Sequence, residues 1–188
     1  MKKVFIFISL AAILVLSACG NKDNANNNTN MDMGGDHSNM GDMGSMNHSG
    51  SGEVPAGLKE AQNPTYKVGD EVVIHAKHME GMDGAKSKVV GAYDTVAYAV
   101  TYTPTTGGEP VPNHKWIIQE EIKDAGSEPL QPGTKVTIEA DHMEGMKGAE
   151  GTIDSAEKTT VYMVDYTPTT GGNPIRNHQW VVESELSK

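Results

Sequence analysis

The chain has 188 residues, enough for one ordinary domain or two small ones. Its 15 Lys and Arg residues against 25 Asp and Glu residues give a formal net charge of −10, which disfavours a nucleic-acid partner. A single Cys excludes an internal disulfide, and two Phe and two Trp residues are too few for one large aromatic core. We therefore expect small cores, and we expect the clustered Met residues to be informative about function.

The first 18 residues are typical of a bacterial lipoprotein signal peptide. Two lysines precede an apolar stretch over 4–16, which is too short for a comfortable membrane span. The sequence LSAC over 16–19 resembles a lipobox, so we expect cleavage before Cys19 and attachment of a lipid to its thiol. This predicts a chain anchored to the membrane and facing outward. A plain secretory signal with an incidental cysteine is the alternative.

Residues 19–52 are expected to form a disordered tether, because they include no Val, Ile, Leu or aromatic residue. Within the tether, residues 31–48 hold five Met and two His residues in 18 positions. Thioethers are soft ligands and imidazole is intermediate, so this mixture without thiolates suits copper, with Cu(I) favoured, whereas zinc prefers Cys or more His. The predicted ligands of the tether are Met31, Met33, His37, Met40, Met43, Met46 and His48. A low-complexity linker that binds no metal is the alternative.

The remainder of the chain is an internal duplication. Residues 66–122 align with residues 130–186 at an offset of 64 without a gap, and 27 of the 57 aligned pairs are identical. A match of this length predicts two domains of similar size. We place the first over 53–124 and the second over 125–188.

Each repeat reads as short strands joined by tight turns, without helical periodicity, which predicts an all-β fold. The expected strands cover 71–76, 88–92, 96–103 and the segment around Trp116, with their counterparts over 135–140, 151–156, 160–167 and around Trp180. Strands this short favour a small closed sheet. The run HMEGMxGA, followed by a strand of alternating Tyr and Val, is similar to SH3-like barrels of the KOW type. The resemblance implies two tandem small SH3-like barrels after the tether.

The sequence HMEGM occurs once in each repeat and offers an imidazole and two thioethers within five residues. A glycine inside the motif allows the loop to wrap around a soft ion. The candidate ligands are His78, Met79, Met82, His142, Met143 and Met146. Alternatively the thioethers fill a small core that lacks Phe and Leu, a use to which Met is well suited. A mixed outcome, with one Met buried and the other exposed beside the His, is also compatible with the pattern.

Two further motifs are repeated. In the sequence NHxW, His114 and His178 precede Trp116 and Trp180 by two positions, so each His either binds a metal or hydrogen-bonds within the barrel. The sequence YTPTTGG has the composition of a hairpin connection and needs no ligand role. No nucleophilic thiol remains once Cys19 carries a lipid, and no nucleophile or phosphate-loop motif is present, so we expect no enzyme.

The lipobox, the Met/His-rich spacer and the paired motifs HMEGMxGA and YTPTTGGxPxxNHxW together resemble the YdhK-type bacterial lipoproteins, a group that includes the copper-binding CopL-type lipoproteins of Gram-positive bacteria. The resemblance covers nearly the whole chain. It implies a lipoprotein that binds copper ions outside the membrane and contributes to copper tolerance, beside a copper exporter or a multicopper oxidase.

The function expected from the sequence is therefore copper sequestration at the cell surface by a monomer. The alternative is a module that binds cell wall or peptide, with the tether as a spacer. An aromatic groove made by Tyr98, Tyr102 and Trp116 would favour the alternative, whereas sulfur atoms of the HMEGM loops that face solvent together would favour copper.

Overall fold

The structure is a computed structural model that describes residues 49–188. The predicted signal peptide, Cys19 and the candidate ligands Met31, Met33, His37, Met40, Met43, Met46 and His48 lie outside the described residues. Residues 49–188 contain strands and two short 3-10 helices but no α-helix, which confirms the all-β prediction. No helix in this part of the chain is long and apolar enough to cross a membrane.

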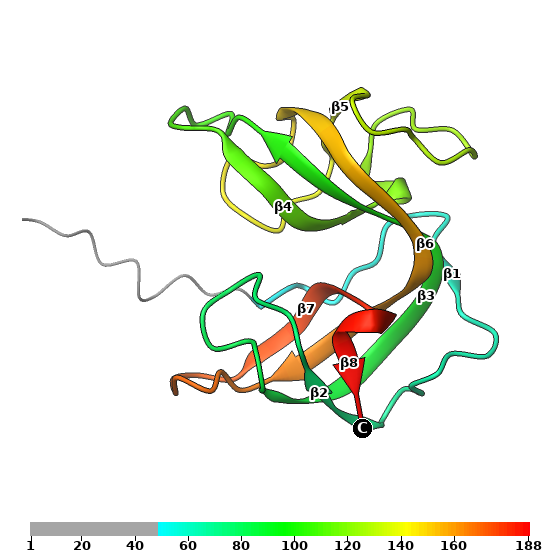
Figure 1. Cartoon of the computed structure of the whole chain (residues 1–188), viewed down its shortest axis with the longest axis vertical. Coiled ribbons are helices and arrows are strands. Elements are labelled where there is room, and N and C mark those ends of the chain that lie inside the picture. Colours follow the sequence, from blue (N-terminus) through cyan, green and yellow to red (C-terminus); the bar gives the residue numbers. More distant parts are fainter. Residues whose placement is uncertain (1–48) are drawn as a thin grey trace, which may run out of the picture. The chain divides into compact units, whose positions relative to one another are not determined.

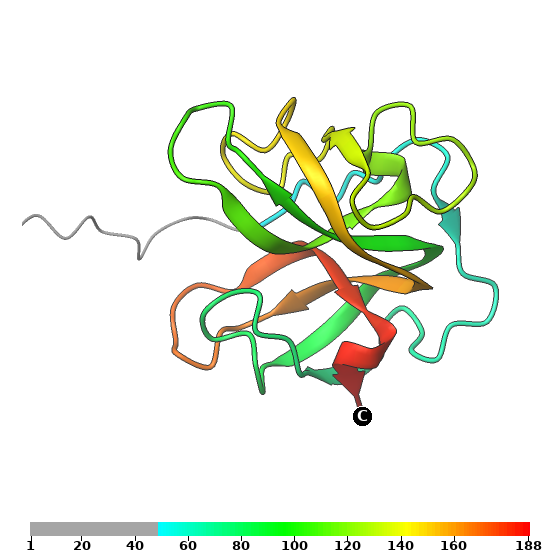
Figure 2. The ribbon, with the colours of Figure 1, turned by 45° about the horizontal axis from the view of Figure 1, so that its top comes forward.

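The described strands form one connected sheet in the order β5-β6-β3-β2-β8, with β1 and β4 also paired to β3 and with β7 paired to β6. Figures 1 and 2 show two lobes joined by the long strands β3 and β6. The elements are β1 (Lys59–Glu60), β2 (Glu71–Ile74), β3 (Lys86–Tyr102), β4 (Val111–Ile118), η1 (Gln119–Glu121), β5 (Lys135–Thr137), β6 (Glu150–Tyr166), β7 (Ile175–Val182), η2 (Glu183–Glu185) and β8 (Leu186–Ser187).

Strands β3 and β6 pair antiparallel along almost their full length of 17 residues each. Thr95 pairs with Thr159, its own equivalent in the other repeat, so an approximate two-fold axis passes between these two residues. The prediction of two separate strands before and after residues 93–95 is wrong. The backbone continues through this segment because it is paired with residues 159–161.

All three hydrophobic clusters combine residues of both repeats. The first cluster joins β2 and the start of β3 to the end of β6, β7 and β8, and the second joins the end of β3 and β4 to β5 and the start of β6. A central third cluster contains Trp116 and Trp180. The sequence predicts that each repeat packs its own core within 53–124 or 125–188. The packing differs from that expectation because β3 and β6 each cross from one lobe to the other.

The HMEGM loop of each repeat contacts the YTPTTGG hairpin of the other repeat. The carbonyl of Gly81 in the first HMEGM loop accepts a 2.8 Å hydrogen bond from the N–H of Thr169, in the YTPTTGG hairpin of the second repeat. In the same way, the carbonyl of Gly145 accepts a 2.9 Å hydrogen bond from the N–H of Thr105. Each hairpin therefore fixes the HMEGM loop of the other repeat.

We predict that Gly145→Ala destabilises the protein by about 1–3 kcal/mol more than Gly107→Ala. Both glycines have positive φ, +75° and +84°, so both substitutions carry a backbone cost. A Cβ at position 145 would lie 2.7 Å from Oγ1 of Thr106 and 3.0 Å from Cβ of Pro104, whereas nothing lies within 4 Å of one at position 107. Denaturant unfolding followed by Trp fluorescence measures the difference. Equal losses of stability in the two variants would contradict the close packing of the YTPTTGG hairpin of one repeat against the HMEGM loop of the other.

Candidate functional site

A pocket of about 990 Å³ brings together candidate ligands from both repeats. Its wall includes Met79, Met143 and four of the chain's histidines: His78, His114, His142 and His178. The sequence predicts these side chains in separate barrels. In the structure they line one pocket, because β3 and β6 each cross from one lobe to the other.

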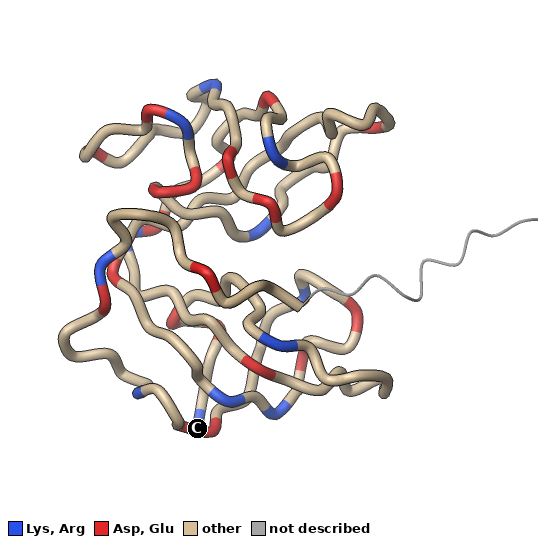
Figure 3. Tube along the Cα trace, turned by 180° about the vertical axis from the view of Figure 1, so that it is seen from behind, with Lys and Arg blue, Asp and Glu red and all other residues tan. Residues whose placement is uncertain are grey.

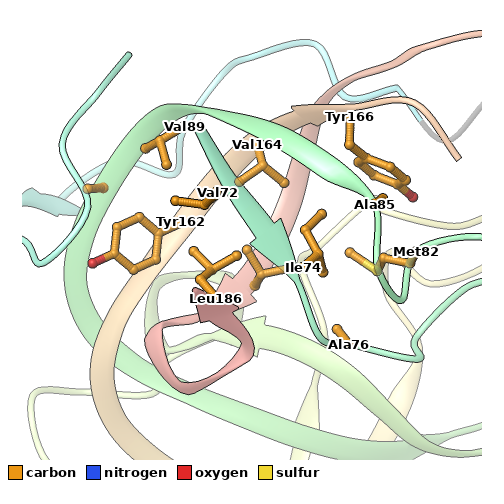
Figure 4. Packing of buried hydrophobic residues seen from close by; sticks show 12 residues of the cluster. Val72, Ile74, Ala76, Met82, Ala85, Val89, Tyr162, Val164, Tyr166 and Leu186 are labelled. Carbon is orange, nitrogen blue, oxygen red and sulfur yellow. The ribbon is translucent and has the colours of Figure 1, made fainter. Parts of the chain in front are cut away.

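The two methionines of each HMEGM loop have different environments. Met82 and Met146 have no exposed surface and belong to the first and second hydrophobic clusters. Figure 4 shows Met82 among the apolar side chains of the first cluster, including Ile74 and Ala85. Met79 and Met143 are partly buried and line the pocket. In this structure Met82 and Met146 are therefore core residues, and only the first methionine of each loop is placed to act as a ligand.

The loop histidines are held by glutamates of the opposite repeat. Nε2 of His78 lies 2.7 Å from Oε1 of Glu185, and Nε2 of His142 lies 2.7 Å from Oε1 of Glu121. The Nδ1 atoms of both rings are buried and have no hydrogen-bond partner among residues 49–188. Each ring is thus fixed through one nitrogen, while its other nitrogen is buried without a partner.

The same two carboxylates also accept hydrogen bonds from the indole N–H groups of the two tryptophans. Nε1 of Trp116 donates to Oε2 of Glu185 at 2.9 Å, and Nε1 of Trp180 donates to Oε2 of Glu121 at 3.2 Å. The N–H of Val182 donates to Glu185 at 3.2 Å. Burial alone would raise the pKa of Glu185, but the hydrogen bond and charge of His78, with the Trp116 and Val182 donors, lower it below its ordinary value of 4.5.

Sequence reasoning missed these two glutamates, although a signal was present. Glu121 and Glu185 are aligned with each other and identical, whereas the two residues before them, Gln119-Glu120 and Glu183-Ser184, differ between the copies. An isolated identical acid near a strand end is unremarkable by itself. Its importance follows from the exchanged topology, which brings it to the histidine of the other repeat.

His114 and His178 complete the histidine group. Their rings make edge-on contacts with Tyr102 and Tyr166, at centroid distances of 5.8 and 5.7 Å. Burial, reinforced by the charges of His142 and His78, lowers the pKa of His114 to about 4. His114 is therefore neutral near pH 7 and retains a nitrogen lone pair.

Within residues 49–188, no group of three or more His, Cys, Asp or Glu side chains is arranged to hold a metal ion. Nitrogen and carboxylate ligands alone therefore do not form a ready-made site in this part of the chain. Thioether donors are outside that count, and Met79 and Met143 line the same pocket as the histidines. The pocket wall thus offers thioethers in addition to imidazole and carboxylate groups, and the imidazole–thioether pairs suit soft ions.

The aromatic groove considered for a wall-binding or peptide-binding module is not formed. Tyr98, Tyr102 and Trp116 are all buried. Among residues 49–188, Val54 and Val68 are the exposed large hydrophobic residues. Figure 3 shows acidic and basic positions interspersed over both lobes.

We predict that Glu185→Gln lowers the free energy of unfolding by about 1–3 kcal/mol at pH 7, because an amide cannot match the carboxylate as acceptor for His78 and Trp116. The pKa of Glu185 is lower in the folded state, so its contribution is present above pH 4.5 and is lost as the pH falls through the folded-state pKa. The difference from the unaltered protein should therefore shrink in acid. Denaturant unfolding at pH 7 and pH 3 tests this, with the exposed Glu139→Gln as control, and a difference that does not depend on pH contradicts it.

Comparison with known proteins places the chain among relatives without an assigned activity. A relative from Bacillus subtilis (strain 168), the uncharacterized protein YdhK, is 58% identical over 180 residues, which cover 96% of this chain and 86% of the relative. A crystal structure of the B. subtilis DUF1541 family protein ydhK matches with a TM-score of 0.73 and 64% identity, over 75% of this chain and 96% of that chain. A solution NMR structure of the ydhK C-terminal domain matches with a TM-score of 0.61 and 65% identity, over 64% of this chain and 92% of that chain.

The pattern of one family, described as a protein of unknown function (DUF1541), matches twice, over residues 68–119 and 132–183. These two segments correspond to the repeats found by aligning the chain with itself. The chain therefore belongs to the DUF1541 family and carries two copies of its repeat.

Proposed function

We propose that this protein binds and sequesters copper ions, chiefly Cu(I), at the outer face of the bacterial membrane. The observation that supports this most directly is a pocket whose wall includes His78, His142, Met79 and Met143. Imidazole and thioether without thiolate form a donor set that favours copper over zinc or the hard divalent ions. The Met/His-rich segment over 31–48 has the same donor types.

The position of the pocket relative to the chain supports a joint role for the two groups of donors. Residues 49–51 and 53–56 contribute to the pocket wall, and Ser49 directly follows the Met/His-rich segment. The N–H of Gly50 donates to the carbonyl of Arg176 at 2.9 Å, which holds this part of the chain against β7. Donors that precede Ser49 are therefore connected to the chain at the pocket itself.

The proposed mechanism is buffering, in which the protein lowers the concentration of free copper at the cell surface and so contributes to copper tolerance. The lipid on Cys19 would keep the protein at the membrane, and a copper exporter or a multicopper oxidase is the expected neighbour. Thioether sites should bind Cu(I) with little dependence on pH, whereas imidazole sites should weaken below about pH 6. No catalytic step is assigned.

A wall-binding or peptide-binding function has weaker support. Its expected surface was an aromatic groove, and the three side chains proposed for it are buried. The pocket wall is instead rich in histidine and acidic residues, including Glu120, Glu139 and Asp141.

We predict that replacing the five Met and two His residues of 31–48 by Ser and Asn lowers the number of Cu(I) ions bound by residues 20–188, and leaves some binding in the pocket. The substitutions remove soft donors and leave every described residue of the hydrophobic clusters unchanged. Anaerobic Cu(I) titration against a competing chelator measures the number of ions, and thermal unfolding serves as the control for folding. An unchanged number would remove the segment from the proposal, and an unaltered chain that cannot compete with a chelator of modest affinity would contradict copper sequestration itself.

A further inference from the structure

We infer that Nδ1 of His78 and Nδ1 of His142, each with the thioether of the adjacent Met79 or Met143, are the atoms that bind a soft monovalent cation in the pocket. This inference rests on the proposed function and deepens it, because it assigns the donor atoms and the residues that orient them. It also excludes Met82 and Met146, which are core residues.

The two glutamates determine which ring nitrogen of each histidine carries the hydrogen. A carboxylate only accepts hydrogen bonds, so the Nε2 atoms that lie 2.7 Å from Glu185 and Glu121 carry the hydrogen. In a neutral imidazole the other nitrogen then holds a lone pair. In that neutral form the Nδ1 lone pairs of His78 and His142 are available to a metal, whereas in the charged form that pairs with the glutamates a metal must displace the Nδ1 proton.

The Nδ1 atoms of both rings are buried without a hydrogen-bond partner among the described residues. The His78 side chain is 9% exposed and that of His142 is 12% exposed, and neither Nδ1 atom has a hydrogen-bond partner among residues 49–188. A buried polar atom without a partner costs on the order of 1–3 kcal/mol and calls for an explanation. The same arrangement occurs in both copies of the repeat, which favours a common use.

A carboxylate holds each histidine ring through its other nitrogen. Histidines that bind metals commonly donate their second ring N–H to a carboxylate, which fixes the tautomer and the orientation of the ring. Glu185 and Glu121 take this position, and each is itself fixed by a tryptophan N–H. The ligands are thus supported before an ion arrives.

One thioether of each loop lies beside the loop histidine in the chain. Met79 and Met143 follow the histidines directly in the chain and line the same pocket. The next methionine in each loop, Met82 or Met146, anchors the loop in a hydrophobic cluster. One imidazole nitrogen and one thioether from each loop form a neutral, soft donor set, which fits Cu(I) or its analogue Ag(I).

The test uses Ag(I), a soft monovalent probe that is stable in air, and residues 20–188 carrying the Ser and Asn substitutions in 31–48. Trp116 and Trp180 are the only tryptophans, and both donate to the carboxylates that hold the loop histidines. Tryptophan fluorescence therefore reports on the pocket. We expect a saturable change in fluorescence on Ag(I) addition, with an affinity weakened at least tenfold by the pair His78→Gln and His142→Gln, and also by the pair Met79→Leu and Met143→Leu.

Matched controls are available in the same chain. His75→Gln changes an exposed histidine that contacts Ser187, and Met163→Leu changes a buried methionine of the central cluster, so both should leave the affinity for Ag(I) unchanged. Neither residue lines the pocket. Equal weakening by the control and loop substitutions would overturn the assignment.

A second measurement needs no substitution in the loops and so does not depend on whether the variants fold. Long-range 1H–15N correlation of the imidazole rings distinguishes a ring nitrogen with a free lone pair from one bound to a metal. We expect Ag(I) to shift the Nδ1 resonances of His78 and His142 and to leave their Nε2 atoms protonated. Unshifted Nδ1 resonances in a chain that still binds Cu(I) would overturn this inference while the proposed function stands, whereas the absence of Cu(I) binding by the unaltered chain would defeat the proposed function itself.

Discussion

The antiparallel pairing of β3 with β6 is the constraint on which the rest of the structure depends. The two strands run antiparallel along each other with Thr95 opposite Thr159, and the two ends of each strand lie in different lobes. A loop at the start of one repeat therefore packs beside the strands at the end of the other. This exchange brings the HMEGM loop to the opposite hairpin, and the loop histidine to the opposite glutamate. Without it, the two sets of candidate ligands would have no reason to face a common pocket.

The sequence was sufficient to predict the all-β class and the duplication, but not the exchange. Alternating apolar residues state which face of a strand is buried, and they do not state which copy supplies the partner. Two similar repeats offer nearly the same partners within a copy and between copies. Residues 93–95 and their equivalents 157–159 were a local guide, because they contain no glycine or proline to make a turn between the predicted strands. Their continuous pairing in β3 and β6 became clear only from the three-dimensional structure.

The candidate site was predictable in residue type and only partly in geometry. His78 and Met79 could be selected from their chemistry, but the spacing in HMEGM does not distinguish a pocket methionine from a core methionine. The decision comes from the loop path: Met82 follows Gly81, whose positive φ of +74° turns the chain, and enters the first cluster. Glu185 lies more than a hundred residues from His78, a separation at which a pair cannot be found by spacing alone.

The approximate two-fold symmetry is broken at one place that matters for function. Residues 49–51 and 53–56 line the pocket, and Gly50 and Glu53 make hydrogen bonds to β7, whereas no equivalent hydrogen bonds to β4 occur within residues 49–188. The Met/His-rich residues are thereby joined covalently to a single side of a symmetric pocket. A linkage of this kind raises the local concentration of one group of donors at the other without any direct contact between them. Under the proposed function, an ion released by one group is therefore rebound more readily by the other, which should make the overall release slower than from either group alone.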